Sequence, residues 1–241
     1  MISANRNSHT TIQNLLGSPL GGGGGGGGGA SAPVMPEGVT APLGWWSARD
    51  VEVDGSGNIT KILNQGSNGA TNDATPIYAG RAKVANRPEW NDRDVFDLQA
   101  ADAQYTFDNI AEARTLIAVA GYKDGLDAAF DDFDGLISDG IGASAEITGA
   151  SGLTTFFHNM TYFYDGAPAL KTDPWLPSVK RGIAVTNNAS FSAAGTLFGD
   201  KGFPARSWRG YVGDVLAFQA ILSDADILAV HNAIADWYAT A

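Results

Sequence analysis

The amino-acid sequence predicts an all-β sandwich that ends in one helix and follows an extended, glycine-rich N-terminal arm. Three observations predict this class. Beyond residue 44 the chain consists of short β-like runs separated by Gly, Asn and Asp clusters, only its last segment has a convincing helical period, and nine consecutive glycines precede both. With 44% hydrophobic and 10% aromatic residues, the 241-residue chain has the composition of a globular protein. It contains no cysteine, so a hydrophobic core must stabilise it without disulfides.

The arm spans residues 1–44, where Arg6 and Glu37 are the only Lys, Arg, Asp or Glu residues. Such a composition cannot bury enough apolar surface to fold alone. Ordering nine glycines costs about 10–20 kcal/mol of conformational entropy, so we expect neighbouring chains to hold the arm. A backbone without side chains fits a crowded symmetry axis or a groove in a larger particle. The arm is therefore predicted to be an assembly anchor, centred on Gly21, Gly22, Gly23, Gly24, Gly25, Gly26, Gly27, Gly28 and Gly29.

Three segments have the pattern of strands. Residues 115–122 (TLIAVAGY) are apolar on both alternating faces, as expected for a central strand that is covered on both sides. Residues 161–166 (TYFYDG) carry an aromatic at every second position and end in a turn pair. Residues 210–222 (GYVGDVLAFQAIL) alternate again. Strict alternation in this last segment places Val212, Leu216 and Phe218 on one face, and Tyr211, Val215 and Ala217 on the other.

The end of the chain is predicted to be helical over residues 223–239. Ser223 and Asp226 form an S-x-x-D capping box. The apolar residues that follow recur at a helical period, namely Ile227, Val230, Ile234, Trp237 and Tyr238.

The first and last blocks of residues 45–241 resemble a known family. The opening LGWWSARDVEVDGSGNITKILNQGSNGATNDA and the closing WRGYVGDVLAFQAILSDADILAVHNAIADWYA are similar to the two ends of concanavalin A-like lectin/glucanase sandwiches, specifically the laminin-G-like subgroup. The resemblance implies a jelly-roll sandwich over residues 45–241 that closes with the helix. It carries little information on function, because this sandwich serves enzymes, lectins and display modules alike.

A glycoside hydrolase is not favoured. The glucanases of this sandwich carry an E-x-D-x-(x)-E array, because retaining hydrolysis needs two carboxylates about 5 Å apart. Residues 51–57 (VEVDGSG) contain Glu52 and Asp54 but lack the second glutamate. The three histidines are dispersed, and no G-x-S-x-G or H-E-x-x-H motif accompanies them. We therefore expect a protein that is not an enzyme.

An acidic segment raises the question of a metal ion. Residues 127–140 contain five aspartates, four of which are the closest candidates for Ca²⁺ ligands: Asp131, Asp132, Asp134 and Asp139. The segment is not an EF-hand, because the acidic residue required at position twelve is missing. A solvated acidic loop without a cofactor is the favoured interpretation, and a Ca²⁺ site is the alternative.

Sugar recognition requires exposed aromatic rings with Asn, Asp or Gln nearby. The residues with such neighbours in loop-like sequence are Trp90, Trp175, Phe203 and Trp208. They are the candidates for a glycan-binding face, and their alternative role is that of buried hydrophobic plugs. Trp45, Trp46 and Trp237 are expected to anchor the core.

The net charge and the N-terminal sequence limit the classes of partner that we expect. The net charge of −11 opposes binding to nucleic acid. The first twenty residues contain no continuous apolar stretch, so neither a secretory signal nor a membrane anchor is expected there. A sandwich behind such an arm looks like a bacteriophage virion protein. This architecture implies that the protein is made in the host cytoplasm and forms a homo-oligomer. The arm would dock on other virion proteins, and the sandwich would decorate the head or form part of a tail fibre. Host surface polysaccharide would be a further contact. A free carbohydrate-binding lectin module is the alternative, and a glycoside hydrolase the second.

Overall fold

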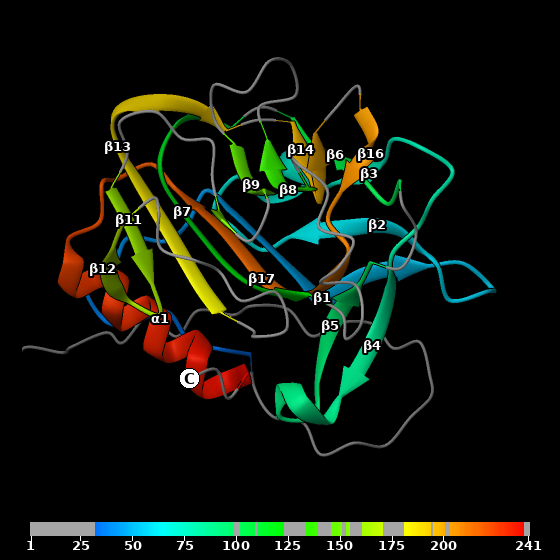
Figure 1. The fold of residues 1–241 in the computed structure, drawn as a ribbon, viewed down its shortest axis with the longest axis horizontal. Helices are drawn as coiled ribbons and strands as arrows, with labels where there is room; N and C mark the ends of the chain where they lie inside the picture. The colour runs from blue at the N-terminus through cyan, green and yellow to red at the C-terminus, as the bar shows by residue number, and fades with distance from the viewer. Residues whose placement is uncertain are drawn as a thin grey trace, which may run out of the picture. The chain divides into compact units, whose positions relative to one another are not determined.

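Two sheets and one helix make up the described part of the chain (Figure 1). The computed structural model describes residues 32–98, 102–108, 110–122, 134–138, 146–150, 153–154, 161–170, 181–193, 195–200 and 203–238. These ranges all belong to one compact unit, Ala32–Ala241.

The larger sheet contains nine of the described strands. Seven form a continuous path in the order β12 (Ala167–Ala169), β11 (Thr161–Tyr164), β13 (Arg181–Ala193), β7 (Ile110–Tyr122), β17 (Gly210–Phe218), β1 (Gly44–Val53) and β2 (Ile59–Asn64). The other two, β4 (Lys83–Arg87) and β5 (Arg93–Asp97), pair with each other, and β5 also pairs with β17. Every pairing described in this sheet is antiparallel.

The smaller sheet contains eight short strands. Six follow the order β10 (Leu153–Thr154), β9 (Glu146–Ala150), β8 (Asp134–Ser138), β14 (Thr196–Leu197), β6 (Tyr105–Thr106) and β3 (Thr75–Pro76). At its edge β15 (Gly199–Asp200) pairs with β16 (Phe203–Ser207), which also meets β8 in parallel. Two 3₁₀ turns, η1 (Gly69–Asn72) and η2 (Pro88–Trp90), and the helix α1 (Asp224–Tyr238) complete the described elements.

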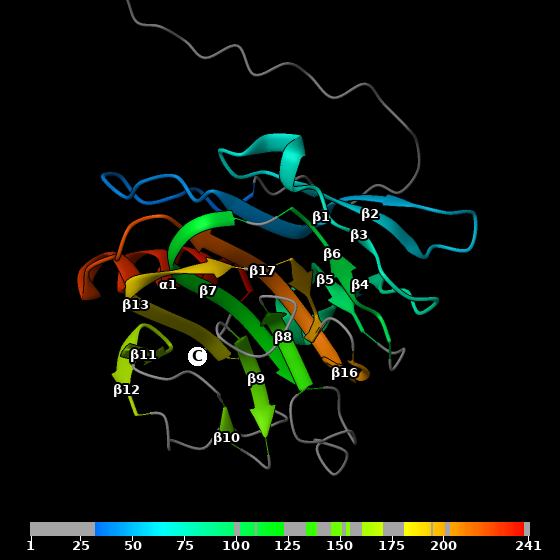
Figure 2. The same cartoon turned by 90° about the horizontal axis from the view of Figure 1, so that it is seen from above.

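The larger sheet is covered on both faces, which the pattern of residues 115–122 predicted. Leu116, Ala118 and Ala120 of β7 belong to the core shared with the smaller sheet. Ile117 and Val119 belong to a second core, which includes residues of α1. Figure 1 and Figure 2 show α1 and the smaller sheet on opposite sides of β7 and β17. The prediction of a central strand is confirmed.

The predicted helix and the predicted turn at the end of residues 161–166 are also confirmed. The helix α1 begins at Asp224, where the Ser223 Oγ accepts a hydrogen bond from the Asp226 backbone N–H at 3.2 Å, and the Asp226 carboxylate accepts one from the Ser223 N–H at 3.3 Å. This reciprocal pair is the capping box. β11 and β12 form an antiparallel hairpin, whose turn residues Asp165 and Gly166 both have positive φ, the conformation of a type I′ turn.

The prediction of strict alternation in β17 is wrong for Tyr211 and Val212. Val212 lies in the core between the sheets together with Val215 and Ala217, whereas Tyr211, Leu216 and Phe218 lie in the core beneath α1. The register explains the difference: Val212 pairs with Ala120 but Val215 with Ala118, so β17 uses three steps where β7 uses two. This β-bulge at residues 213–214 reverses the alternation of side chains.

The folded unit begins before the predicted boundary at residues 44 and 45. We call residues 32–43 the strap. Met35 and Val39 of the strap pack against the core beneath α1. The Leu43 N–H donates to the Ala217 carbonyl of β17 at 2.8 Å. The strap is therefore part of the folded unit and was wrongly assigned to the arm.

Candidate functional site

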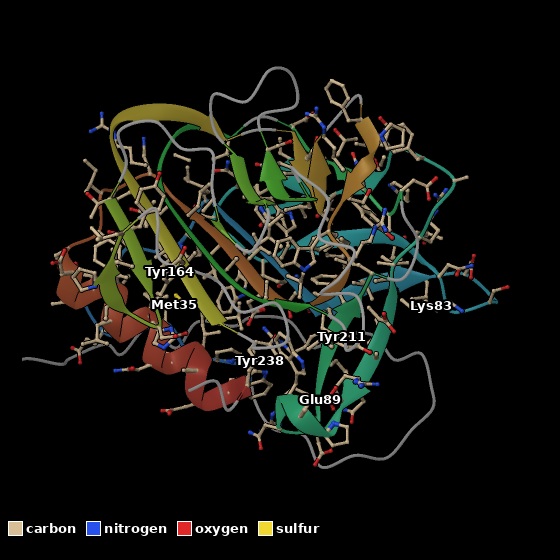
Figure 3. The ribbon with its side chains drawn as sticks, viewed as in Figure 1. Met35, Lys83, Glu89, Tyr164, Tyr211 and Tyr238 are labelled. Atoms are coloured by element: carbon tan, nitrogen blue, oxygen red, sulfur yellow. The ribbon has the colours of Figure 1, made fainter. Side chains whose placement is uncertain are left out.

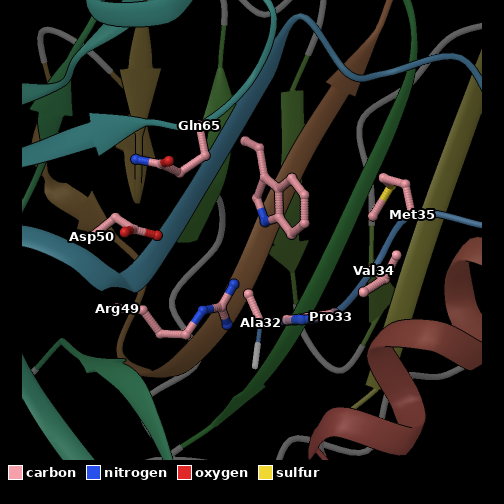
Figure 4. Close-up of a pocket in the computed structure, with 8 residues that line it drawn as sticks. Ala32, Pro33, Val34, Met35, Arg49, Asp50 and Gln65 are labelled. Carbon is pink, nitrogen blue, oxygen red and sulfur yellow. The ribbon is translucent and has the colours of Figure 1, made fainter. Parts of the chain in front are cut away.

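An open cleft of about 490 Å³ lies between the strap and the outer face of β1 (Figure 4). Its size is within the range of small-molecule sites. In Figure 4, Asp50 and Gln65 lie on one side of the cleft, and Val34 and Met35 on the other. The lining residues are Ala32, Pro33, Val34, Met35, Trp45, Arg49, Asp50 and Gln65.

Two of the lining residues, Trp45 and Arg49, bond to Asp214 of β17 near the point where this strand changes its partner. Residues 215–217 of β17 pair with β1, while residues 211 and 212 pair with β5. The bulge at Gly213 and Asp214 lies between these two pairings. Tyr238, at the end of α1 (Figure 3), packs directly on this backbone, because a Cβ built on Gly213 would be 2.7 Å from its ring. Any side chain at position 213 would displace the ring.

A buried ion pair fills the branch point. The Asp214 side chain has no exposed surface, and its Oδ1 lies 3.0 Å from Nη2 of Arg49. Arg49 also donates to Asp214 Oδ2 at 3.4 Å and to the Tyr238 hydroxyl at 3.3 Å. Burial acts to lower the pKa of Arg49, but the groups around the guanidinium, first among them the Asp214 carboxylate, together raise it above its ordinary value. The guanidinium therefore holds β1, β17 and α1 together.

The same carboxylate fixes an aromatic residue of the cleft. Trp45 donates from Nε1 to Asp214 Oδ1 at 3.1 Å, and its backbone N–H donates to Asn64 Oδ1 at 2.7 Å. Trp45 is half-buried, whereas Trp46 is completely buried between the sheets. Adjacent residues of a strand point to opposite faces, so only one tryptophan of the pair can enter that core. The expectation of a core anchor is therefore confirmed for Trp46, while Trp45 lines the cleft.

Two polar side chains of the cleft have no hydrogen-bond partner within the described part of the chain. Asp50 is half-buried, and burial raises the pKa of its carboxyl group, against the lowering effect of Arg49. Gln65 is exposed, and its backbone N–H is bonded to the Trp45 carbonyl at 2.8 Å while its amide remains available. Cleft residues with unmade hydrogen bonds are suited to bind a ligand that supplies donors and acceptors.

The four sequence-predicted glycan residues do not form one face. Trp90 and Trp208 are 2% and 0% exposed, so neither ring offers a face to a sugar, and both are buried plugs. Trp90 packs edge-on against Tyr238, with ring centroids 5.5 Å apart. Phe203 is 47% exposed, with the Arg206 guanidinium 4.0 Å from its ring centroid. Trp175 lies outside the described residues.

The predicted metal ligands and assembly glycines are only partly described. Asp134 is the first residue of β8, where its backbone pairs with Gly149. Asp131, Asp132, Asp139 and Gly21–Gly29 lie outside the described residues. Within the described ranges no group of three or more His, Asp or Glu residues could hold a metal ion.

The carboxylate considered for hydrolysis serves a turn. The Asp54 carboxylate accepts hydrogen bonds from the backbone N–H groups of Ser56 at 2.8 Å and Asn58 at 2.9 Å, and from the Asn58 amide at 3.0 Å. The bonds from Asn58 and Ser56 lower the pKa of Asp54. This is the arrangement of a turn-stabilising aspartate.

Comparison of the chain with protein-family models, curated proteins and solved structures found no match. Among the described residues no helix is long and apolar enough to span a membrane.

Proposed function

We propose that the chain is a non-enzymatic structural protein of a bacteriophage particle, in which the N-terminal arm docks on other virion proteins and the folded unit is displayed on the head or in a tail fibre. The observation that supports this proposal best is that backbone hydrogen bonds attach the end of the strap to β17 and to the residues that follow β2. A chain that is anchored through its N-terminus must connect the anchor firmly to the displayed unit. The proposed homo-oligomer follows from the arm, whose glycines suit a crowded contact between copies.

The strap is tied to the larger sheet at its end. Besides the bond from Leu43 to β17, the Ser67 N–H donates to the Pro42 carbonyl at 2.8 Å, and the Asn68 N–H donates to the Leu43 carbonyl at 3.1 Å. A Cβ on Gly66 would overlap the Leu43 carbonyl oxygen, so the close approach requires glycine there. A pull on the arm is thus transmitted to β17, which lies between β7 and β1.

We also propose a specific fold class for the two sheets and the helix. Two facing, mostly antiparallel sheets, a shared core and a C-terminal helix packed on the outer face support a concanavalin A-like jelly roll of the laminin-G-like kind. In this proposal the sandwich is a display unit.

Deletion of residues 1–31 tests the display function. The truncated chain keeps the strap, so we expect its circular dichroism spectrum and melting temperature to match those of the full chain. In a complementation experiment, particles produced with the truncated chain should lack it. The variant Phe203→Ala, which changes an exposed residue of the sandwich, is the matched control and should be incorporated normally. Normal incorporation of the truncated chain would overturn the proposal.

A second candidate function, sugar binding, is favoured by the cleft. The half-buried indole of Trp45 is suited to the apolar face of a pyranose ring. The Asp50 carboxylate and the Gln65 amide, which have unmade hydrogen bonds, are suited to its hydroxyl groups. We propose that the cleft contacts a surface polysaccharide of the host, or, in a free lectin module, any glycan with the same ring. Titration with neutral oligosaccharides tests this function. Gln65→Ala should weaken binding, while Ile221→Ala, which changes an exposed residue that does not line the cleft, should leave binding unchanged.

A further inference from the structure

The charges around the cleft do not balance. Arg49 carries one positive charge, and both Asp214 and Asp50 carry a negative one. Because Asp214 is completely buried against Arg49, these two charges neutralise each other below the surface of the cleft. Among the described residues that line the cleft, the charge that remains for a ligand is that of Asp50.

Arg49 cannot offer its full charge to an anionic ligand. Its Nη1 and Nη2 atoms are both hydrogen-bonded to Asp214, and Nη1 also to Tyr238. Turning the guanidinium toward the cleft would leave the Asp214 carboxylate unpaired in a buried position, which is strongly unfavourable. A uronate or a phosphorylated sugar would therefore meet Asp50, and the described residues that line the cleft offer no second cation to compensate it.

Asp50 lacks the donors that a buried carboxylate normally has. Within the described ranges no N–H or O–H donates to it, although it is half-buried beside Arg49. An ammonium group in the cleft would supply up to three donors together with the opposite charge. A ligand hydroxyl would supply one donor and no charge.

We propose that Asp50 makes the cleft selective for amino sugars with a free ammonium group, over neutral sugars of the same ring and over uronates. This inference rests on the proposed sugar binding and names the chemical class of the ligand. The pyranose ring lies against Trp45, the ammonium group faces Asp50, and Gln65 takes hydroxyl groups at the rim.

A matched pair of ligands tests the selectivity. Tetramers of β-1,4-linked glucosamine and of its N-acetylated form have the same linkage and ring but differ in charge. Isothermal titration of the full chain at pH 6 and low salt should give an affinity about tenfold higher for the glucosamine tetramer, because an ion pair in a partly exposed cleft contributes modestly. High salt should reduce this ratio. A glucuronate-containing oligomer should bind more weakly than the N-acetylated tetramer.

Two variants distinguish binding of the cationic tetramer in the cleft from its general electrostatic attraction to an acidic protein. Asp50→Asn should abolish the preference for the glucosamine tetramer and leave binding of the N-acetylated tetramer nearly unchanged. Glu52→Gln removes the same charge from an exposed residue two positions away and should keep the preference. Equal loss of preference in both variants, or equal affinity of the full chain for both tetramers, would overturn the inference but not the sugar-binding function. Binding of no tetramer to the folded chain would overturn both.

Discussion

Arg49 and Asp214 are 165 positions apart in the sequence, yet they form a 3.0 Å ion pair in which the Asp214 side chain is completely buried. The pair lies where β17 leaves β1 and begins to pair with β5. It also bonds to Trp45 and Tyr238, so it fixes two side chains of the cleft, Arg49 and Trp45, and the end of α1.

Replacing Arg49 by Ala should lower the free energy of unfolding by about 3 kcal/mol, because the Asp214 carboxylate would remain buried without its cation. Asp214→Ala should cost a similar amount. In the double variant the loss should be smaller than the sum of the two single losses, since neither charge is then left alone. Chemical denaturation of the four proteins measures this coupling, and strict additivity would contradict the role of the pair.

Gly213→Ala should lower the free energy of unfolding by about 1–3 kcal/mol, because the new methyl group would meet the Tyr238 ring. Gly55→Ala is the matched control, since a Cβ at Gly55 meets no atom within 4 Å. Thermal unfolding of both variants checks the prediction. A loss at Gly55 as large as that at Gly213 would show that the effect is not due to contact with Tyr238.

Asp50→Asn should not destabilise the protein. Burial raises the pKa of Asp50, so the stability associated with its neutral form is present below about pH 3.8 and is lost as the pH rises through the folded-state pKa. At pH 7 the ionised carboxyl group therefore costs stability, and the amide removes that cost. Because Asp50 is only half-buried and water screens its charge, we expect the free energy of unfolding to stay equal or to rise by less than about 1 kcal/mol. A clear loss would mean that Asp50 stabilises the fold instead of serving a ligand.

His231 should contribute to the pH dependence of stability. It is buried in α1, and burial lowers its pKa, against the raising effect of Asp165. Its contribution is therefore fully present above about pH 6.5 and is lost as the pH falls through the folded-state pKa. Between pH 7 and pH 5 the free energy of unfolding should fall less steeply in His231→Leu than in the natural sequence. Identical slopes would contradict this prediction.

The sequence predicted the elements whose pattern is local. The capping box and period of α1, the apolar run of β7 and the turn after β11 are all set by neighbouring residues, and each is found where it was expected. The bulge in β17 depends on a change of partner strand and could not be derived in this way. Its one local signal is the pair Gly213–Asp214, a glycine and a charge inside an otherwise apolar strand.

The site residues were harder to predict for the same reason. Trp90 and Trp208 stand among polar residues in the sequence, and only the tertiary contacts bury them. The cleft depends on the strap, on β1 and on Gln65, which no local motif connects. The adjacent pair Trp45–Trp46 was the available signal, since a strand cannot bury both in one core.

The central claim is that residues 1–31 attach the protein to a particle while the folded unit faces outward. A photoreactive amino acid placed at Leu20 in the assembled particle, followed by irradiation and mass spectrometry, tests it most directly. The account predicts crosslinks from Leu20 to other virion proteins or to neighbouring copies, and no such crosslinks from the same group placed at Phe203 of the sandwich. Crosslinks to virion proteins from Phe203 and none from Leu20 would contradict it.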